Sequence, residues 1–425
     1  MASAMQSIAF DPANAKAALA ELPQRPAVFA LHGADAHAEP YIGRTPNLRG
    51  RLERLLQPSP KHPRRLQLAG RVRRIAWQLT GSEFEGLLAQ FSLLEEIYGA
   101  KALERMHLRA PAFIRYLGGN PYPRIVVTNR PSQREAGWAY GPFASRAAAE
   151  RFAEEALKLF LLRRCTDDLH PDPSFPGCVY SEMKMCLAPC YKGCTDERYA
   201  EESIAVQSFL ATRGESRLVQ LRTQRDEASS KLAFESASAL HAQAQKVESV
   251  RALAPELVRP MSQLRAVVLQ TSANPDEVAV FLYDNGKLRG PAAFSTVGMR
   301  IQNERSGSSS LFAHPMAIEP IPEAVAAGES ARDAASSEIA TEAPAKAARG
   351  VLEARMETAL AALAESADAP SATVRQGHLA LLKRWYYRPE TRRPGEIFFP
   401  DAEGGWPVKA LLRGVGRVFA GGLKP

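Results

Sequence analysis

The sequence predicts an α+β protein built from several small units. Short apolar runs bounded by turn residues, which are typical of strands, alternate with segments in which apolar residues recur at helical spacing. Residues 199–253 are predicted to form a mostly helical arm, with Gly214 as the obvious break. The sequence Asp284-Asn285-Gly286 follows an apolar run and is a strong signal for a β-hairpin. Together these features favour small mixed units of sheet and helix.

The first unit is expected to be compact and to end near residue 107. Its strand candidates are residues 26–31, 41–43 and 72–79. Asn47 is the expected N-cap of a helix whose apolar residues continue to Leu56. Ser82 is the expected N-cap of the next helix, with Glu85 as its capping-box partner three residues later. The apolar face of that helix continues to Ile97.

The rest of the chain is expected to alternate in the same way. Further strands are expected at residues 124–128, 140–143, 266–269 and 278–283, the last two joined at the Asp284-Asn285-Gly286 turn. Helices are expected from Ser145 to about residue 162, and at 351–363 and 378–387, followed by an irregular end rich in Pro and Gly. Residues 315–348 are mainly Ala, Glu, Pro and Ser, which is the composition of a disordered linker.

Positive charge is concentrated in the N-terminal part of the chain. The 425 residues, enough for two or three domains, include 54 Lys and Arg against 46 Asp and Glu, a formal net charge of +8. Much of the excess lies in one basic run: Lys61, Arg64, Arg65, Arg71, Arg73 and Arg74, preceded by Arg44, Arg49, Arg51 and Arg54. Such a concentration favours a polyanion such as nucleic acid, because binding releases condensed counterions. The alternative is an ordinary solvated patch.

The N-terminus carries no targeting signal that the sequence makes visible. A charged segment followed by an apolar one, as in a secretory signal peptide, is not seen at the start of the chain. No apolar run is long enough to span a bilayer. We therefore expect a cytoplasmic protein that does not contact membranes, and a cytoplasmic setting argues against disulfides as the use of its cysteines.

Cysteines gather in one short window. Cys178, Cys186 and Cys190 follow the pattern Cys-x7-Cys-x3-Cys, Cys165 stands upstream and Cys194 lies just behind. Thiolates are soft ligands, so this grouping predicts an iron–sulfur cluster or a closed zinc site. Inert buried thiols are the alternative for any one of them. The spacing supplies only one pair of the kind that zinc knuckles use unless Cys194 is counted, and it does not choose the metal.

Several short motifs in a fixed order resemble a known family. Residues 27–29 (Ala-Val-Phe) stand before Tyr41-Ile42-Gly43, and Asn47-Leu-Arg-Gly-Arg51 and Tyr140-Gly-Pro-Phe143 follow. The cysteine window and residues 232–237 (Leu-Ala-Phe-Glu-Ser-Ala) complete the series. Together they resemble the N-terminal half of the UvrC family of the excinuclease ABC system, which begins with a GIY-YIG nuclease domain. The resemblance runs from about residue 26 to 250.

The resemblance implies a DNA-repair endonuclease of nucleotide excision repair that incises the strand near a lesion. It implies Tyr41 as general base, Arg51 as the arginine that stabilises the phosphate, and Arg44 where the family keeps a lysine. A divalent ion, Mg²⁺ or Mn²⁺, would assist the reaction. It also implies a [4Fe–4S] cluster on Cys165, Cys178, Cys186 and Cys190, and docking on the damage-recognition helicase UvrB through residues 232–237. Arg49 and the basic run Lys61, Arg64, Arg65, Arg71, Arg73 and Arg74 are the expected DNA contacts.

Two departures from the family pattern bear on cleavage. Phe29 replaces the first motif's tyrosine, and Gln90 stands where the family keeps its metal-binding glutamate. A neutral amide is a poor ligand for a hard divalent ion. Glu83 and Glu85 are acids of the same segment that could be recruited, but neither has the helical spacing needed to take over the place of Gln90. The docking motif also fades, because residues 241 and 242 are His and Ala where the family has Arg and Asp.

Two hypotheses follow, and they leave open whether the chain is an enzyme. The first is a nuclease that makes one incision, with the Cho-like layout that lacks an RNase H-like second domain, since residues 351–425 read as too short and irregular for one. The second is a non-catalytic DNA- or partner-binding module. The expected divisions are a nuclease-like domain (20–107), an α+β segment with the cysteines (108–198), a helical arm (199–255), a β-rich segment (256–314), a linker (315–350) and a tail (351–425).

Overall fold

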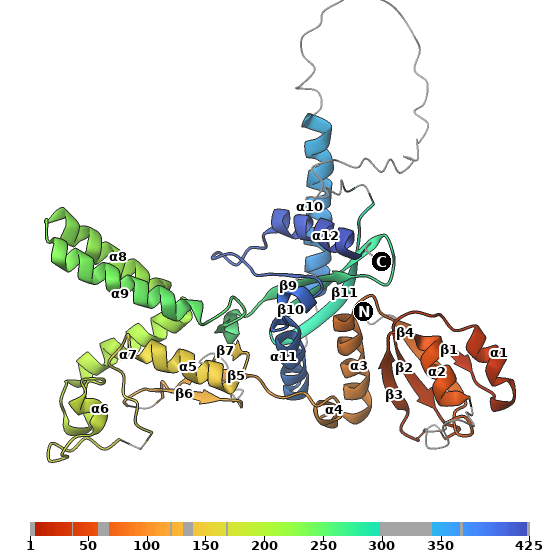
Figure 1. Ribbon diagram of the computed structural model, residues 1–425, viewed down its shortest axis with the longest axis horizontal. Coiled ribbons are helices and arrows are strands. Elements are labelled where there is room, and N and C mark those ends of the chain that lie inside the picture. Colours follow the sequence, from red (N-terminus) through yellow and green to blue (C-terminus); the bar gives the residue numbers. More distant parts are fainter. Residues whose placement is uncertain are drawn as a thin grey trace, which may run out of the picture.

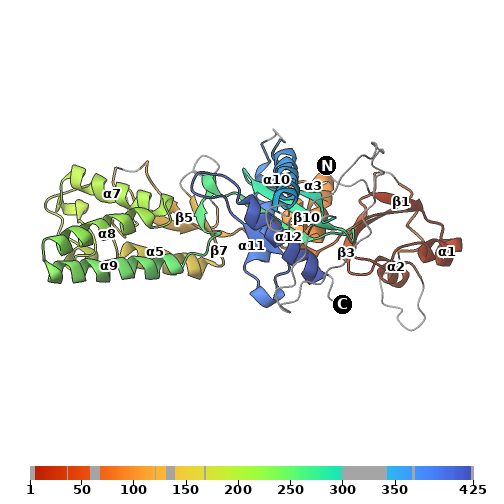
Figure 2. The same cartoon turned by 90° about the horizontal axis from the view of Figure 1, so that it is seen from above.

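The structure is a computed structural model that describes residues 5–35, 37–57, 68–119, 121–130, 139–166, 169–297, 299, 342–365 and 369–422, and of residues 342–349 and 422 the backbone only. Over these residues the chain forms three four-stranded sheets, each antiparallel, so the α+β prediction is confirmed. The molecule is elongated. Figures 1 and 2 show the N-terminal sheet at one end, a second sheet with its helices in the middle, and a helical arm at the other end.

The N-terminal unit has helices on both faces of its sheet. Its strands are β1 (Gln6–Ala9), β2 (Ala27–His32), β3 (Tyr41–Thr45) and β4 (Arg74–Leu79), in the order β1-β4-β2-β3. Its helices are α1 (Ala15–Ala20), α2 (Leu48–Leu56), α3 (Glu83–Tyr98) and α4 (Lys101–Arg105), with a 3-10 turn at Pro12–Asn14. Leu48 and Leu52 of α2 share a buried cluster with Phe29, whereas α3 meets the opposite face, where Gly86 lies against Arg44.

The starts of α2 and α3 follow the caps that the sequence predicts. Asn47 accepts the backbone N–H of Gly50 at 2.9 Å, and Ser82 accepts that of Glu85 at 3.1 Å. The Glu85 carboxylate does not return to the N–H of Ser82, as a capping box would have it. It accepts the N–H of Gly81 at 2.7 Å instead. The carboxylate thereby fastens the loop before α3 to the first turn of the helix.

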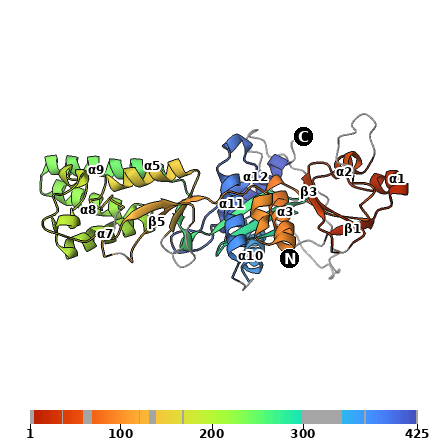
Figure 3. The same ribbon diagram turned by 90° about the horizontal axis from the view of Figure 1, so that it is seen from below.

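The middle unit contains the cysteines and the helical arm. Its strands are β5 (Ala112–Tyr116), β6 (Ile125–Thr128), β7 (Ala139–Phe143) and β8 (Arg259–Pro260), in the order β6-β5-β7-β8. Its helices are α5 (Arg146–Leu157), α6 (Val179–Glu182), α7 (Asp196–Ala211), α8 (Glu215–Ser230) and α9 (Phe234–Ala252), with a 3-10 turn at Pro189–Tyr191. Figure 3 shows α5 beside α9. The arm is helical with its break at Gly214, where φ is +85°, as the sequence predicts.

One helix of this unit is shorter than its sequence suggests. The sequence predicts a helix from Ser145 to about residue 162, but α5 ends at Leu157. The reason lies in the core: after the helix ends, the chain turns so that Phe160 and Leu162 both enter the buried cluster of the middle unit. An apolar run read as a continuing helical face is here a non-helical segment that buries Phe160 and Leu162 and leaves Leu161, between them, exposed.

The C-terminal unit is a sheet between two layers of helices. Its strands are β9 (Ala266–Thr271), β10 (Glu277–Asp284), β11 (Lys287–Ser295) and β12 (Glu396–Phe398), in the order β11-β10-β9-β12. Its helices are α10 (Glu342–Ala364), α11 (Ala372–Tyr386) and α12 (Val408–Gly422), with 3-10 turns at Met261–Gln263 and Glu390–Arg392. Val280 and Leu269 face α10 and α12, whereas Phe281 and Val268 face α11 and α3.

Helix α3 belongs to two units at once, which the division at residue 107 did not anticipate. The ring of Phe84 contacts those of Phe281 and Trp385, with centroids 5.2 and 5.5 Å apart. Gly377 of α11 lies so close to the Phe91 ring that a Cβ at this position would overlap it. The helix that follows the N-terminal sheet therefore completes the helical layer over the C-terminal sheet.

The C-terminal end also differs from expectation. The turn at Asp284-Asn285-Gly286 joins β10 to β11, with Asn285 at φ +49° and Gly286 at φ +78°, rather than joining the strands at 266–269 and 278–283. The irregular tail is wrong as an expectation, because β12 pairs with β9 and α12 packs on the sheet. A strand of three residues gives little periodicity to read, and its pairing partner lies far back in the sequence.

The structure describes only part of the expected linker. Residues 315–341 lie outside the described residues, whereas 342–350 are part of α10. Among the residues that the structure describes, every helix is too short or too polar to cross a membrane.

Candidate functional site

Tyr41 lies at the start of β3, on the face of the N-terminal sheet that α2 covers. It stands opposite Leu31 in the register of β2 and β3, and Phe29 stands opposite Gly43. The rings of Tyr41 and Phe29 are 6.2 Å apart at their centroids. Phe29 is buried, and a Cβ at Gly43 would come within 2.6 Å of its ring. The first motif therefore places an apolar ring beside Tyr41, where a tyrosine would bring a second hydroxyl.

Arg51 lies on the same side of the sheet. It is half-buried in α2, one position before Leu52, which packs in the cluster that contains Phe29 and against which Tyr41 rests. The Asn47 cap fixes where α2 begins and hence which side of the helix Arg51 occupies. Tyr41 and Arg51 therefore both belong to the side of the sheet that α2 covers.

Arg44 projects from the other face, because it is three residues beyond Tyr41 in an uninterrupted strand. Its methylenes lie over Gly86 of α3, where a Cβ would come within 2.9 Å of Arg44 Cδ. Its guanidinium is 3.5 Å from a carboxylate oxygen of Glu83. Arg44 is therefore the contact between β3 and the start of α3.

Gln90 follows Gly86 by one helical turn, so it shares the side of α3 that meets β3. Helix α3 runs alongside β3 in this region, because the hydroxyl of Tyr98 donates to the carbonyl of Pro40 at 3.1 Å. Gln90 is half-buried between these two contacts. The predicted catalytic residues are consequently divided: Tyr41 and Arg51 lie with α2, whereas Arg44 and Gln90 lie with α3, across the sheet.

The two acids at the start of α3 are both engaged. Arg388 donates two hydrogen bonds to Glu83, at 2.8 and 2.9 Å, and these bonds hold the pKa of Glu83 below its usual range. Glu85 is buried and accepts the N–H of Gly81, and burial raises the pKa of this carboxyl. Arg388 has no signal in the sequence that links it to this helix. In the part of the chain that the structure describes, no three His, Cys, Asp or Glu side chains are arranged to hold a metal ion.

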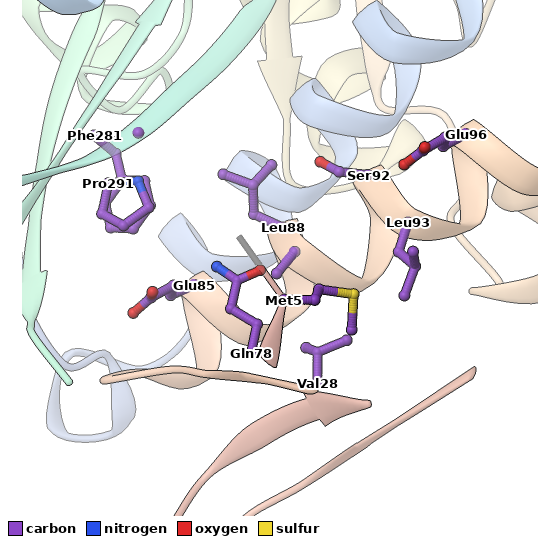
Figure 4. A pocket seen from close by; sticks show the side chains of 12 residues that line it. Met5, Val28, Gln78, Glu85, Leu88, Ser92, Leu93, Glu96, Phe281 and Pro291 are labelled. Atoms are coloured by element: carbon purple, nitrogen blue, oxygen red, sulfur yellow. The ribbon is translucent and has the colours of Figure 1, made fainter. Parts of the chain in front are cut away.

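A cavity lies between the N-terminal and C-terminal units, and its lining includes Val28, which stands opposite Arg44 in the sheet, and Ala89, which precedes Gln90. It has a volume of about 140 Å³, and Gln78 and Glu85 bring their polar ends into it beside Val28, Phe281 and Pro291 (Figure 4). A neighbouring cavity of about 330 Å³ shares Gln78 and Glu85. Tyr41, Arg44, Arg51 and Gln90 line neither of these two cavities.

The expected DNA contacts have different surroundings. Arg71, Arg73 and Arg74 are exposed just before and at the start of β4. Arg49 instead donates to the carbonyl of Leu22 at 2.7 Å and ties α2 to the preceding loop. Lys61, Arg64 and Arg65 fall outside the described residues.

The four cysteines of the predicted cluster lie in one region of the middle unit, although no three of their thiols are arranged to hold a metal ion in the part of the chain that the structure describes. Burial raises the pKa of Cys186, and the thiols of Cys178, Cys190 and Cys165 add to this shift. The backbone N–H of Ala188 points at the sulfur of Cys186 and opposes the shift. All four side chains are half-buried. They therefore lie within electrostatic reach of one another.

Two further features of the middle unit are the position of Cys194 and the exposed turn between α8 and α9. Cys194 packs against the buried cluster of this unit and interacts with Cys190 and Asp196, not with the other three thiols. At the tip of the arm, Leu232 and Phe234 are 73% and 66% exposed. Single exposed apolar residues are ordinary on protein surfaces, but two of them within three residues at one turn mark a candidate contact point.

Comparisons with known proteins agree with this architecture. The family model described as UvrC/Cho excinuclease, middle domain, matches residues 113–209, which run from β5 to α7 and include every cysteine. UvrABC system protein C of Alcanivorax borkumensis is 26% identical over 285 residues, which are 67% of this chain and 46% of that protein. The same protein of Pseudomonas fluorescens is 28% identical over 234 residues, 55% of this chain and 37% of its own length.

A third relative, UvrABC system protein C of Symbiobacterium thermophilum, is 27% identical over 282 residues, 65% of this chain and 44% of that protein. The chain therefore spans less than half the length of these curated relatives. No solved structure matches the chain. The family match and these relatives together support a UvrC/Cho-like family for this chain.

Proposed function

We propose that this chain serves nucleotide excision repair as a DNA-binding protein of the UvrC type in which GIY-YIG phosphodiester cleavage is strongly weakened. The name UvrABC system protein C, shared by the relatives, supports the pathway. The exposed arginines Arg71, Arg73 and Arg74 support contact with the phosphate backbone. The weakening of cleavage rests on the geometry around Gln90.

The observation that carries the proposal is the separation of Tyr41 from Gln90 by the N-terminal sheet. Hydrolysis of a phosphodiester needs a base, a cation that stabilises the developing charge and a metal carboxylate, all directed at one phosphorus. Tyr41 rests on the α2 side, while Gln90 shares the side of α3 that meets Arg44. A substrate phosphate on the face of the sheet that carries Tyr41 would have position 90 on the other side of the edge strand β3.

Cleavage, where it occurs, would use Tyr41 and Arg51. Tyr41, in its deprotonated phenolate form, would take the proton of the attacking water and become the neutral phenol, and the guanidinium of Arg51 would stabilise the charge on the phosphorus centre. A divalent ion would supply further charge stabilisation, but an amide at position 90 is a poor ligand for it. Glu83 is held by Arg388 and Glu85 by Gly81, so these two acids do not compensate. Losing such stabilisation slows cleavage on the order of a thousandfold or more.

An incision assay tests this function. A labelled duplex with one bulky lesion would be incubated with the natural chain, with Gln90→Glu and with Tyr41→Phe, in Mg²⁺ or Mn²⁺. We expect the natural chain to bind the duplex and to cut it very slowly, and Tyr41→Phe to abolish what remains. Efficient incision by the natural chain would overturn the proposal.

The second candidate function is a module that binds DNA or a partner and has lost the reaction. The observation that favours it is the bidentate pair of Glu83 with Arg388, which puts a fixed cation beside the helix that should hold a metal. Gln90→Glu distinguishes the two candidates. A gain in incision identifies a weakened nuclease, and no incision by either chain identifies the module.

We further propose that Cys165, Cys178, Cys186 and Cys190 hold a [4Fe–4S] cluster. Four thiols within electrostatic reach of one another, with backbone N–H groups directed at Cys186 and Cys190, suit such a cluster. The alternative is zinc with Cys194 as a ligand, but Cys194 interacts with Cys190 alone among the thiols. A protein purified without oxygen that is colourless and iron-free would exclude the cluster.

The helical arm is proposed to dock on a UvrB-type partner through its tip. Leu232 and Phe234 are the exposed apolar residues there, at the turn between α8 and α9. Val219 provides a matched control, because it is 54% exposed on α8 of the same arm. We expect Leu232→Ser and Phe234→Ser to weaken binding of purified UvrB by at least tenfold in calorimetry, and Val219→Ser to leave it unchanged.

A further inference from the structure

The two cavities between the N-terminal and C-terminal units are neighbours that share Gln78, Glu85 and Pro291. The larger, at about 330 Å³, falls within the range of small-molecule sites, which is roughly 300–1,000 Å³. Strands β2 and β4 and helix α3 line them from one side, and strands β10 and β11 line them from the other. A ligand held in this space would contact both units at once.

One side of α3 lines the smaller cavity along its length. Its lining residues recur at the spacing of one helical face: Glu85, Leu88, Ala89, Ser92, Leu93 and Glu96. Figure 4 shows Glu85 toward one end of this cavity and Glu96 toward the other, with Leu88 and Val28 between them. The two acids are eleven positions apart in α3, which is about 16 Å along the helix axis. An apolar wall therefore separates two carboxylates.

Glu85 is a buried carboxylate with one oxygen still available. Its side chain is 5% exposed, and Oε2 accepts the N–H of Gly81 at 2.7 Å. Oε1 accepts no hydrogen bond from the part of the chain that the structure describes. Burial raises the pKa of this carboxyl, and the N–H of Gly81 opposes the shift. A positively charged donor in the cavity would satisfy the second oxygen and stabilise the ionised form.

The charge of the lining is negative. Glu277 of β10 adds a third carboxylate in the larger cavity, where it accepts from the side-chain amide of Asn274 at 2.8 Å. Among the described residues that line the two cavities, none is Lys, Arg or His. At the edge of the larger cavity, Arg25 donates to the carbonyl of Ala273. The space therefore favours a cation.

We propose that these two cavities form a binding site for a long linear polyamine, such as spermine. Its ammonium groups would donate to Glu85, to Glu96 at one end and to Glu277 at the other, and its methylene chain would lie against Leu88 and Val28. The ammonium groups of such an amine are spaced along an apolar chain, as the carboxylates are spaced along the apolar wall. The proposal depends on neither DNA cleavage nor DNA binding.

A compact metal ion suits this lining less well. Mg²⁺ or Ca²⁺ needs several oxygen ligands around one point. Glu85 and Glu96 are too far apart in α3 to share one ion. In the described ranges of the chain, no three His, Cys, Asp or Glu side chains are arranged to hold a metal ion. An extended cation with several charges is the ligand that reaches both acids.

The substitution that tests the site is Glu85→Gln. It keeps the shape of the side chain and an oxygen for the N–H of Gly81, but it removes the negative charge. Glu96→Gln removes the acid at the far end, and because Glu96 is exposed this variant keeps the fold. Glu95→Gln is the matched control, since Glu95 is the neighbouring acid of α3 and lines neither of these two cavities.

Binding of spermine to the full chain, freed of nucleic acid, would be measured by calorimetry at constant ionic strength, together with the melting temperature with and without spermine. We expect one site in the natural chain and a higher melting temperature when it is filled. Glu85→Gln should weaken binding about tenfold or more, because a charged hydrogen bond to a buried group is lost. Glu96→Gln should weaken it about two- to fivefold, because that acid is exposed. Glu95→Gln should bind as the natural chain does.

Putrescine, which has two ammonium groups on a short chain, tests the length of the site. We expect it to bind at least about tenfold more weakly than spermine, because it cannot contact both Glu85 and Glu96. Equal affinity for putrescine and spermine would overturn the assignment to a long polyamine. So would failure of the natural chain to bind spermine, or the same spermine affinity in Glu85→Gln. A slow or absent incision of DNA leaves these outcomes unchanged, so the two proposals fail separately.

Discussion

Glu83 and Arg388 are 305 positions apart in sequence, yet they form a bidentate ion pair at 2.8 and 2.9 Å. Glu83 opens α3, and Arg388 lies two residues beyond the end of α11. The pair therefore fastens the helix that follows the N-terminal sheet to the C-terminal unit. Arg44 reaches the same carboxylate at 3.5 Å. An acid about two helical turns before the predicted metal position thus joins two units.

Arg388→Ala is expected to lower the free energy of unfolding at pH 7 by roughly 1 kcal/mol, because the pair is bidentate but partly exposed to solvent. Hydrogen bonds from Arg388 lower the pKa of Glu83 from its usual 4.5. The stabilisation is therefore present above pH 4.5 and is lost as pH falls through the lowered pKa. Urea unfolding of both chains between pH 3 and 7 measures this, with the exposed Arg392→Ala as control. A constant difference at every pH would contradict the assignment to Glu83.

Glu85→Gln is expected to stabilise the protein near pH 7 by about 1 kcal/mol. Burial raises the pKa of this carboxyl above 4.5, so the folded state binds its proton more tightly than the unfolded state does. Stability from this group therefore falls as pH rises from 4.5 through the raised pKa. The amide carbonyl of Gln still accepts the N–H of Gly81. Chemical unfolding at pH 4 and pH 7 tests the prediction, which fails if Gln destabilises the chain at pH 7.

Gly377→Ala is expected to lower the free energy of unfolding by about 1–3 kcal/mol, because the added Cβ would overlap the ring of Phe91 and push α11 away from α3. Gly416→Ala is the matched control in α12, where a Cβ would meet no atom within 4 Å. That change should stabilise the helix by about 0.5–1 kcal/mol. Thermal unfolding measures both variants. Equal melting temperatures for Gly377→Ala and Gly416→Ala would show that the contact between α3 and α11 is looser than described.

Cys178→Ser is expected to remove most of the iron from protein purified without oxygen, because a cluster needs all four thiolates. Cys194→Ser should leave the iron content unchanged, since its thiol stands apart from Cys165, Cys178 and Cys186. Iron and zinc are quantified by elemental analysis. Zinc bound in one equivalent, and lost in the Cys194→Ser variant, would instead support a zinc site.

Features that depend on neighbouring residues could be predicted well from the sequence. The caps at Asn47 and Ser82 are confirmed at 2.9 and 3.1 Å, because a cap is decided within three or four residues. The turn at Asn285-Gly286 is confirmed as a hairpin for the same reason, although the strand it leads into was not identified. Strand β12 was missed, because three residues form a strand only by pairing with β9.

The candidate site also contains some features that the sequence predicts and others that only tertiary packing decides. The gathering of Cys165, Cys178, Cys186 and Cys190 could be expected from their sequence window, and the structure brings their thiols near one another. The relation of Tyr41 to Gln90 could not be predicted in this way. Alternation along β3 places Tyr41 and Arg44 on opposite faces, but only the packing of α2 and α3 decides which face each helix covers.

The sequence by itself determined the α+β class, the helix starts, the helical arm and the cysteine window, since each depends on periodicity or spacing over a few residues. Tertiary structure alone decided that α3 is shared by two units and that Glu83 pairs with Arg388. The physical reason is that burial and charge pairing act between surfaces brought together by folding, and a linear chain carries no local signal of which distant surface it will meet.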